Sequence, residues 1–400
     1  MIGLWQPFVV LFSTSLIVAL LTTPIARRIA WKLGSVDQPA ARRINRRPIP
    51  RMGGIAVFAA LCASGVAHLI GTHTLGWPGL FASNPSNVVH INYPLLFVGF
   101  ASIFVTGLLD DYLSLSPKQK LLGQVIAGAA AVTSGLVINV IVNPLTNDGI
   151  GIGPIAYPLT ILYLVAYTNI FNLIDGLDGL AAGIACIASI TMWIVSTMSG
   201  HLDAAALSLM LAGATLGFLR YNFNPASIFL GDCGSLLIGF SLGCISLMSV
   251  SRVSGLTAII VPLVIAGIPI IDTFSAIVRR GRAHVSIGQA DKGHIHHRLM
   301  NEGFNQRQTV LFIYGWTILL SIGSIVMTQV DVIPRILIFC GLVIVSTLFA
   351  IRLHLFTPVL LHHYNPKTGA DELVTPQDPA FKEEAERFEE EHAHFPHLGD

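Results

Sequence analysis

Charged residues are scarce in this sequence, which excludes an ordinary soluble domain. Only 11% of the 400 residues are charged, 53% are hydrophobic, and the mean hydropathy is +0.70. A soluble core cannot hide so much apolar surface. Cysteine is sparse too, with five residues that lack paired or metal-like spacing. Because most of them lie in apolar stretches, we predict small core residues rather than disulfides or a cysteine zinc site.

Long apolar runs dominate the sequence and predict an all-α, polytopic integral membrane protein. A helix needs about 17–25 apolar residues to cross a bilayer. Eleven runs approach this length, so about eleven transmembrane helices are expected. They cover residues 4–26, 53–71, 93–109, 121–142, 155–171, 180–199, 204–219, 235–250, 256–277, 309–328 and 335–355.

The distribution of lysine and arginine predicts the orientation. Cytoplasmic loops carry an excess of these residues. With the N-terminus outside, the outer loops hold only Arg252 and Arg335, whereas the inner loops hold seventeen basic residues. The inner set is Arg27, Arg28, Lys32, Arg42, Arg43, Arg46, Arg47, Arg51, Lys118, Lys120, Arg220, Arg279, Arg280, Arg282, Lys292, Arg298 and Arg307.

The two ends of the sequence differ in character. The first apolar run lacks a basic segment before it and a small-residue cleavage site, which predicts a retained helix rather than a signal peptide. Residues 358–400 hold acids and histidines with little apolar periodicity, which predicts a flexible cytoplasmic tail. The expected domains are therefore a membrane domain at 1–357 and a tail at 358–400.

Acidic residues before the tail number only twelve, and seven of them return to short polar breaks on the predicted inner side. Charge is expensive at a bilayer edge, so this pattern predicts a site assembled from several loops. The seven are Asp110, Asp111, Asp175, Asp178, Asp232, Asp272 and Asp291.

Asp110 and Asp111 end the third apolar run, and Lys120 follows shortly after. Adjacent carboxylates repel, so one has a raised proton affinity unless a cation sits between them. A polar helix end is the structural alternative, but acids at a helix C-terminus oppose the helix dipole. We therefore favour a functional role.

The fifth run ends in Asn169-Ile-Phe-Asn172-Leu-Ile-Asp175-Gly-Leu-Asp178-Gly. Positions 169, 172 and 175 share a helical face, and the glycines permit close approach to a ligand. Such a face suits a ligand with many hydroxyls or a hydrated metal.

The segment from Tyr221 to Ser235 precedes the eighth run and includes Asn222, Phe229 and Asp232. Asp232 lies at the start of an apolar helix among Gly231, Gly234 and Ser235, where free amides and a carboxylate can hold a phosphate with its cation. Phe229 is either a surface for base stacking or an interfacial anchor.

The ninth run contains Pro262 and Pro269, which predict a bend. The longest inner loop follows it, with Arg279, Arg280 and the sequence Asp291-Lys-Gly-His294-Ile-His296-His297. The histidines suit phosphate contact, a metal site or a structural loop. The nearby arginines favour phosphate.

The first inner loop, from Val36 to Gly54, is strongly basic. Topogenic charge and contact with anionic lipid, worth about 1 kcal/mol per basic residue, account for its arginines. They do not account for the Pro50-Arg-Met-Gly-Gly turn, so a functional and a topogenic role both stay open.

Four of these segments, all except the basic first loop, carry motifs whose order resembles that of the polyprenyl-phosphate N-acetylhexosamine-1-phosphate transferases of the glycosyltransferase family 4 type. The motifs are Asp110-Asp111, Asn169-x-x-Asn172-x-x-Asp175-Gly-x-Asp178-Gly, Asn224-Pro-Ala with Phe229-Leu-Gly-Asp232, and His294-Ile-His296-His297. The resemblance spans roughly residues 1–355. It implies an Mg2+-dependent enzyme, with Mn2+ as the alternative cation.

Within that family, the His-Ile-His-His form is similar to the branch that moves GlcNAc-1-phosphate from UDP-GlcNAc to undecaprenyl phosphate, releasing UMP, to begin a cell-envelope polysaccharide such as lipopolysaccharide. Phospho-MurNAc-pentapeptide transfer is the enzymatic alternative. A transporter is the non-enzyme alternative, but the sequence shows no inverted repeat. The resemblance implies a bacterial cytoplasmic (inner) membrane location, contact with membrane lipid, no nucleic acid, and a homodimer as one candidate assembly. The orientation predicted from the basic residues places the active site on the cytoplasmic face.

The resemblance also implies roles for individual residues. Asp232 would bind Mg2+ with Asp110 and Asp111, and one of this pair would orient or deprotonate the lipid phosphate. The expected catalytic residues are Asp110, Asp111, Asp232 and His296. The expected substrate-binding residues are Lys120, Asn169, Asn172, Asp175, Asp178, Asn222, Phe229 (on uracil), Arg279, Arg280, His294 and His297. A groove beside the bent ninth helix would admit the prenyl chain.

Overall fold

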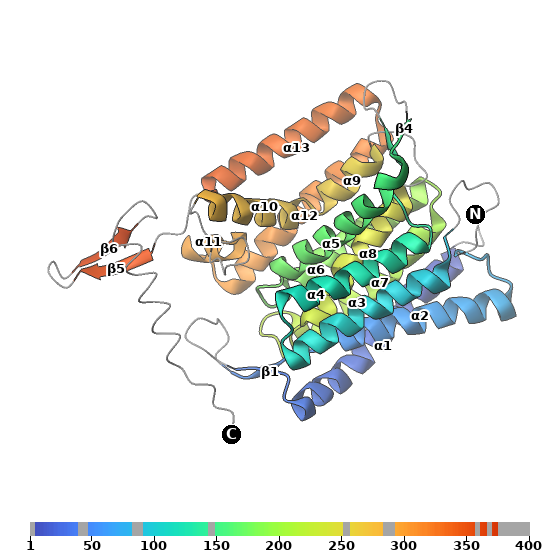
Figure 1. Ribbon diagram of the computed structural model, residues 1–400, viewed down its shortest axis with the longest axis horizontal. Coiled ribbons are helices and arrows are strands. Elements are labelled where there is room, and N and C mark those ends of the chain that lie inside the picture. Colours follow the sequence, from blue (N-terminus) through green and yellow to red (C-terminus); the bar gives the residue numbers. More distant parts are fainter. Residues whose placement is uncertain are drawn as a thin grey trace. The chain divides into compact units, whose positions relative to one another are not determined.

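The computed structural model describes residues 5–38, 47–81, 91–142, 149–250, 257–282, 293–356, 361–365 and 370–374. Helices dominate it (Figure 1). They are α1 (Trp5–Leu33), α2 (Gly54–Leu75), α3 (Tyr93–Leu113), α4 (Pro117–Thr133), α5 (Ala156–Ile174), α6 (Leu180–Met198), α7 (Leu202–Asn222), α8 (Asp232–Val250), α9 (Thr257–Ile265), α10 (Gly267–Arg282), α11 (Ile295–Asn301), α12 (Gln306–Gln329) and α13 (Val332–Arg352), with a 3-10 turn at Gly153–Ile155.

The strands are short and form three antiparallel pairs. They are β1 (Val36–Asp37) with β2 (Ile49–Pro50), β3 (Val140–Val142) with β4 (Gly149–Gly151), and β5 (Leu361–Asn365) with β6 (Ala370–Val374). The last pair falls within the predicted tail, most of which lies outside the described residues. The predicted all-α class is confirmed.

Nine helices in the described part of the chain are long and apolar enough to cross a membrane. The chain is thus a multi-pass membrane protein, while the count of eleven stays a prediction. The predicted run 121–142 corresponds to α4, which ends early, at Thr133. The predicted run 256–277 is divided into α9 and α10 at Ala266. Pro269 has no N–H to continue the first helix, which agrees with the predicted bend.

The chain divides into two compact units. The first contains residues 1–270 and 305–343, and the second contains residues 271–304 and 344–400. In the first unit, α8 is the central helix and packs against α2, α3, α5, α6 and α7. Large apolar side chains remain exposed on the outer helices, such as Val66, Leu69 and Ile70 of α2. Lipid is the natural solvent for such a surface.

α3 and α4 are joined by a tight connection at 114–116 that fixes both helix ends. Ser114 ends α3 in a left-handed conformation. Ser116 then begins α4 with a capping box to Gln119, and Pro117 occupies the first turn. The two helices therefore run back along each other, which brings the end of α3 beside the start of α4.

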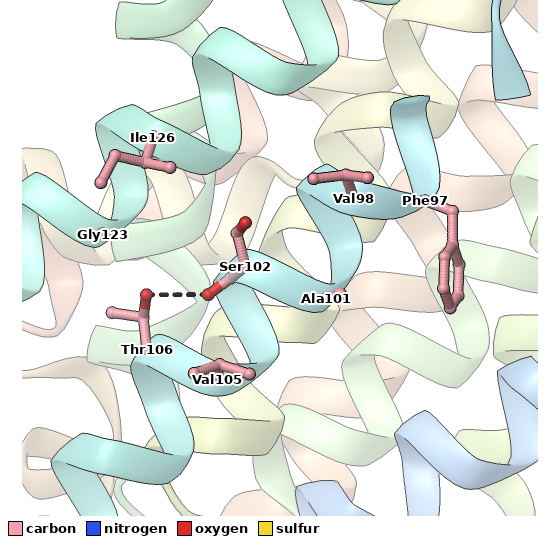
Figure 2. Close-up of a pocket in the computed structure, with 8 residues that line it drawn as sticks. All are labelled: Phe97, Val98, Ala101, Ser102, Val105, Thr106, Gly123 and Ile126. Atoms are coloured by element: carbon pink, nitrogen blue, oxygen red, sulfur yellow. Dashed lines mark hydrogen bonds between the residues drawn. The ribbon is translucent and has the colours of Figure 1, made fainter. Parts of the chain in front are cut away.

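An apolar groove of about 420 Å³ lies between α3 and α4 (Figure 2). Its lining residues are Phe97, Val98, Ala101, Ser102, Val105, Thr106, Gly123 and Ile126. The Thr106 hydroxyl donates to its own helix at Ser102 O (2.8 Å), so it adds no free polar group. At one end Gly123 lies directly against Thr106, where an added Cβ would fall 2.2 Å from Oγ1. The groove thus begins at a close contact between the two helices.

Candidate active site

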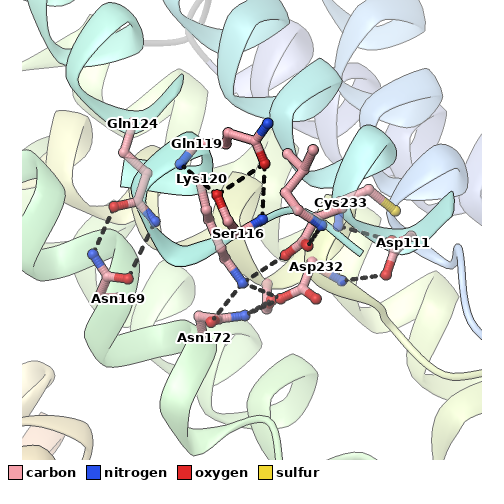
Figure 3. A network of polar contacts seen from close by, with 12 residues as sticks. Asp111, Ser116, Gln119, Lys120, Gln124, Asn169, Asn172, Asp232 and Cys233 are labelled. Carbon is pink, nitrogen blue, oxygen red and sulfur yellow. Dashed lines mark hydrogen bonds and ion pairs between the residues drawn. The ribbon is translucent and has the colours of Figure 1, made fainter. Parts of the chain in front are cut away.

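Lys120 lies at the centre of a polar cluster in the first unit (Figure 3). Its ammonium is 2.9 Å from Asp110 Oδ2 and 2.7 Å from Asp232 Oδ1. It also donates to Asn172 Oδ1 at 3.2 Å. These partners come from α3, α8 and α5, so the cluster joins three helix ends that are distant in sequence. Burial lowers the pKa of Lys120, but Asp232 and Asp110 together raise it by more, and the net pKa is above its usual value.

Asp110 is held in place independently of Lys120. Its Oδ1 accepts a hydrogen bond from the backbone N–H of Leu115 (2.8 Å), in the connection to α4. Oδ2 is thereby left facing the ammonium. A cation thus lies beside this carboxylate, but it is shared with Asp232 rather than placed between Asp110 and Asp111.

Asp111 points elsewhere and holds the first turn of α8. Its two carboxylate oxygens accept hydrogen bonds from the backbone N–H groups of Asp232 (2.9 Å) and Cys233 (3.0 Å). An anion at a helix N-terminus satisfies unpaired donors and complements the helix dipole. Asp111 is only 2% exposed. Because this buried carboxylate binds the backbone N–H of Asp232 itself, it fixes the position of Asp232.

Gly231 allows the close approach of Asp111. Its φ is +73°, and an added Cβ would fall 2.5 Å from Asp111 Oδ2. Glycine is the residue that tolerates both conditions without strain.

The Pro-Arg-Met-Gly-Gly turn lies against the segment that leads into α8. Gly53 N–H donates to Phe229 O (3.0 Å), and Gly54 N–H donates to Leu230 O (2.9 Å). An added Cβ on Gly54 would fall 2.2 Å from Gly234 N. The two glycines therefore let the first inner loop support the backbone that carries Asp232, a role the sequence alone left open.

Asn172 contacts the residues of the cluster directly, whereas Asn169 pairs with Gln124. The Asn172 amide donates to Asp232 Oδ1 (2.5 Å) and to Ser235 Oγ (2.8 Å). Asn169 instead exchanges two hydrogen bonds with the Gln124 side chain, of 3.1 and 2.7 Å. Its amide is thus occupied within the protein. A direct substrate contact by Asn169 stays a prediction.

Asp175 and Asp178 follow the end of α5. Asp175 caps this helix. Burial, followed by the negative charges of Asp232, Asp111 and Asp178, raises the pKa of Asp175 to about 8. Perturbed carboxylates of this kind concentrate at functional sites.

Asp178 holds the loop after α7. Its Oδ2 accepts from Asn224 Nδ2 (2.9 Å) and from Ala226 N–H (3.0 Å). The Asn224 amide also donates to Gln306 Oε1 (2.7 Å). Asp178 and the Asn-Pro-Ala motif, widely separated in sequence, are therefore in direct contact.

Asn222 and Phe229 also lie in this loop region. Asn222 is buried, accepts from Gly179 N–H (3.1 Å) and donates to Ile228 O (3.0 Å). Its amide thus braces two backbone segments. The Phe229 backbone pairs with residues 50–53, while its side chain remains partly exposed. Uracil stacking on this ring stays a prediction.

The second unit contains the histidine motif. Asp272 is 1% exposed, with Oδ2 2.8 Å from His294 Nδ1 and Oδ1 accepting from Ile295 N–H (2.7 Å). Asp272 therefore ties the start of α11 to α10. Asp291 and Lys292 lie outside the described residues.

The three histidine rings are close neighbours in space, with His296 contacting both of the others. The rings of His294 and His296 are parallel with centroids 5.8 Å apart, and His297 is 4.3 Å from His296. Burial and the neighbouring His297 lower the pKa of His296 to about 3; Asp272 opposes this shift and His294 adds to it. His296 is therefore a neutral ring at physiological pH.

Arg279 and Arg280 are neighbours on α10 with different surroundings. Arg279 is 2% exposed, and its guanidinium donates to Leu355 O and to Ser275 Oγ. Arg280 is partly buried. The contacts of Arg279 hold the segment just after α13, while phosphate binding by either arginine stays a prediction.

The Lys120 cluster has a donor set that fits a divalent cation. Two carboxylate oxygens and one amide oxygen face a single positive charge, and oxygen ligands are those preferred by Mg2+. No three acidic, cysteine or histidine side chains surround one point in the parts of the chain that the structure describes. Asp111 is directed to α8, so the fit rests on Asp110, Asp232 and Asn172.

Sequence reasoning missed Gln124, the hydrogen bond between Asn172 and Ser235, and the contact between the first inner loop and residues 229–234. Gln124 follows Lys120 by one helical turn, which is the one signal that could have indicated it. The other contacts join segments whose sequences carry no mark of their pairing.

Known proteins are similar to this chain over most of its length. Residues 93–250 match the family model described as glycosyl transferase family 4. A protein of Bacillus subtilis, named "Probable undecaprenyl-phosphate N-acetylglucosaminyl 1-phosphate transferase", is 40% identical over 86% of this chain and 91% of its own. The decaprenyl-phosphate N-acetylglucosaminephosphotransferase of Mycobacterium tuberculosis is 34% identical over 78% and 80%. The undecaprenyl-phosphate alpha-N-acetylglucosaminyl 1-phosphate transferase of Escherichia coli K12 is 30% identical over 78% and 83%.

Proposed function

The chain belongs to glycosyl transferase family 4, and from this premise we propose that it transfers N-acetylglucosamine 1-phosphate from UDP-N-acetylglucosamine to undecaprenyl phosphate, with release of UMP. It is an enzyme, which sets aside the transporter alternative. The named relatives act on undecaprenyl or decaprenyl phosphate and carry the same sugar in their names. They support this branch over pentapeptide transfer.

The observation that carries the proposal is the convergence of Asp110, Lys120 and Asp232 at one point. Reaction between a phosphate monoester and a pyrophosphate brings several negative charges together. A site with a lysine ammonium and a cation held by carboxylates stabilises that charge. Such a site at the ends of membrane helices suits one water-soluble substrate and one lipid-borne substrate.

In the proposed reaction an oxygen of the acceptor phosphate attacks the phosphorus that bears the sugar. A new P–O bond forms there, and the bond to the UMP oxygen breaks, so UMP leaves with the electron pair. Asp110, whose Oδ2 faces the cluster, positions the acceptor phosphate. Since a phosphate monoester is already largely ionised near neutral pH, positioning is sufficient and Asp110 need not remove a proton.

We propose that Asp110, Asp232 and Asn172 hold the Mg2+ ion. When bound, this ion would neutralise the pyrophosphate and polarise its phosphorus–oxygen bonds. Asp175 lies beside this set and binds the nucleotide-sugar. His294, His296 and His297 are kept as phosphate-binding residues on the grounds of sequence. The site faces the cytoplasm of the bacterial inner membrane, as the distribution of basic residues predicts.

Purified protein incubated with tritium-labelled UDP-GlcNAc, Mg2+ and undecaprenyl phosphate tests this function. We expect one UMP for each labelled lipid that enters the organic phase, and no transfer in EDTA. UDP-GalNAc and UDP-MurNAc-pentapeptide serve as parallel donors. Transfer from either of these, with none from UDP-GlcNAc, would overturn the sugar assignment. Asp232→Asn is the matched inactive control, and it should still insert in the membrane.

A further inference from the structure

The Lys120 ammonium occupies the point that a cation bound by Asp110, Asp232 and Asn172 would need. Its nitrogen lies 2.9, 2.7 and 3.2 Å from one oxygen of each. An ammonium and a divalent ion cannot both occupy the single point that these three oxygens face. One of the two cations must leave when the other binds.

The oxygens keep their positions without Lys120. Asp110 is held through Oδ1 by Leu115 N–H. Asp232 is held by the Asn172 amide and by the anchoring of its own backbone to Asp111. Lys120 is carried on a flexible four-carbon stem and is 19% exposed. Departure of its ammonium therefore leaves the ligand set in place.

We propose that Lys120 and the divalent cation alternate at these oxygens: the ammonium pairs with Asp110 and Asp232 in the cation-free protein, and the incoming cation displaces it toward the phosphates of the substrates. This inference rests on the proposed function for the identity of the cation. In this proposal Lys120 competes with the metal for the same oxygens, whereas a lysine that only binds substrate would not.

The exchange reverses the local charge. Two carboxylates and one ammonium leave one negative charge in excess, which repels phosphate. When a divalent cation neutralises the two carboxylates and the released ammonium remains nearby, one positive charge is in excess. Phosphate affinity then depends on prior cation binding, because favourable electrostatics develop after the exchange. An ordered sequence, cation before phosphate, follows.

Mn2+ binding measured by electron paramagnetic resonance on the full-length protein in detergent tests the exchange. Lys120→Met removes the competing ammonium, so Mn2+ should bind about tenfold more tightly than to the wild type, within the usual range of coupling between sites. Lys118→Met is the matched control. Lys118 is exposed on the same turn of α4, so this variant loses the same charge and should change the affinity by less than about twofold, since exposed charges are screened. Asp232→Asn should lose the site.

A measurement on the wild-type protein removes any dependence on folding of the variant. Reductive methylation followed by mass spectrometry reports the reactivity of each lysine amine. Lys120 should react slowly without metal and several-fold faster with Mn2+, while Lys118 reacts at the same rate in both. Slower labelling of Lys120 with Mn2+ would overturn the exchange.

The outcomes separate this inference from the proposed function. Tighter Mn2+ binding by Lys120→Met without any sugar transfer by the wild type would support the exchange and overturn the proposed reaction. Equal or weaker Mn2+ binding by Lys120→Met, or no binding by any form of the protein, would overturn the exchange even if UMP is released.

Discussion

Asp110 and Asp111 are adjacent in the chain, yet their carboxylates serve different partners. Successive helical residues point about 100° apart, so one carboxylate meets Lys120 while the other meets the backbone of α8. The sequence-based hypothesis treats both as metal ligands. The contacts favour Asp110 for chemistry and Asp111 for holding the helix that carries Asp232.

This division predicts different results for two matched variants. Asp111→Ala should lower the midpoint of thermal unfolding in EDTA, because it removes the cap of α8, a change that costs about 1 kcal/mol and up to about 2. Asp111→Asn, which keeps one acceptor oxygen, should lie between it and the wild type. Asp110→Ala should abolish transfer with a smaller thermal shift. Fluorescence-detected melting and the UMP assay provide the two readouts. Equal shifts for both alanine variants would contradict the division.

For helices and strands, the sequence predicts where an element begins or bends better than it predicts which elements contact one another. The start of α8 at Asp232 and the bend near Pro269 follow from local chemistry, namely polar residues before an apolar run and a missing N–H. The contact of Gly53 and Gly54 with residues 229–234 could not be predicted in the same way. It depends on how α2 and α8 pack, which no local pattern specifies.

The α3–α4 groove predicts where the chain of the lipid acceptor lies. It begins one turn from Asp110 and Lys120, through Thr106 and Gly123, and is lined mostly by apolar side chains. A prenyl chain attached to a phosphate in the Lys120 cluster would continue directly into it. The groove beside the bent ninth helix, expected from the family resemblance, is a separate location that stays a prediction.

Ala101→Trp, which fills this groove, should raise the apparent KM for undecaprenyl phosphate about tenfold, equivalent to roughly 1.4 kcal/mol, with the KM for UDP-GlcNAc unchanged. A short-chain prenyl phosphate that ends before Ala101 should be unaffected. Val66→Trp, on an exposed apolar face of α2, is the matched control. An unchanged KM for the long acceptor would place its chain elsewhere.

For the molecule as a whole, composition was sufficient to predict a helical membrane protein, because lipid-exposed apolar surface must appear in the sequence. The division into two units was not predictable in this way. It follows from which helices pack together, and residues 271–304 join the segment just after α13 through the buried Arg279. The predicted domain boundary at 357 rested on a change of composition alone.

The contacts of Arg279 predict how much of the C-terminal segment the protein needs. Leu353 and Leu355 are buried, and Arg279 donates to Leu355 O. Truncation after Thr357 keeps these contacts, so turnover and melting midpoint should stay near those of the full chain. Truncation after Arg352 removes both leucines and an acceptor of a buried guanidinium, a hydrogen bond worth about 1.5–3 kcal/mol. The protein truncated after Arg352 should therefore melt at a lower temperature. If the protein truncated after Thr357 loses turnover, the tail itself contributes to activity.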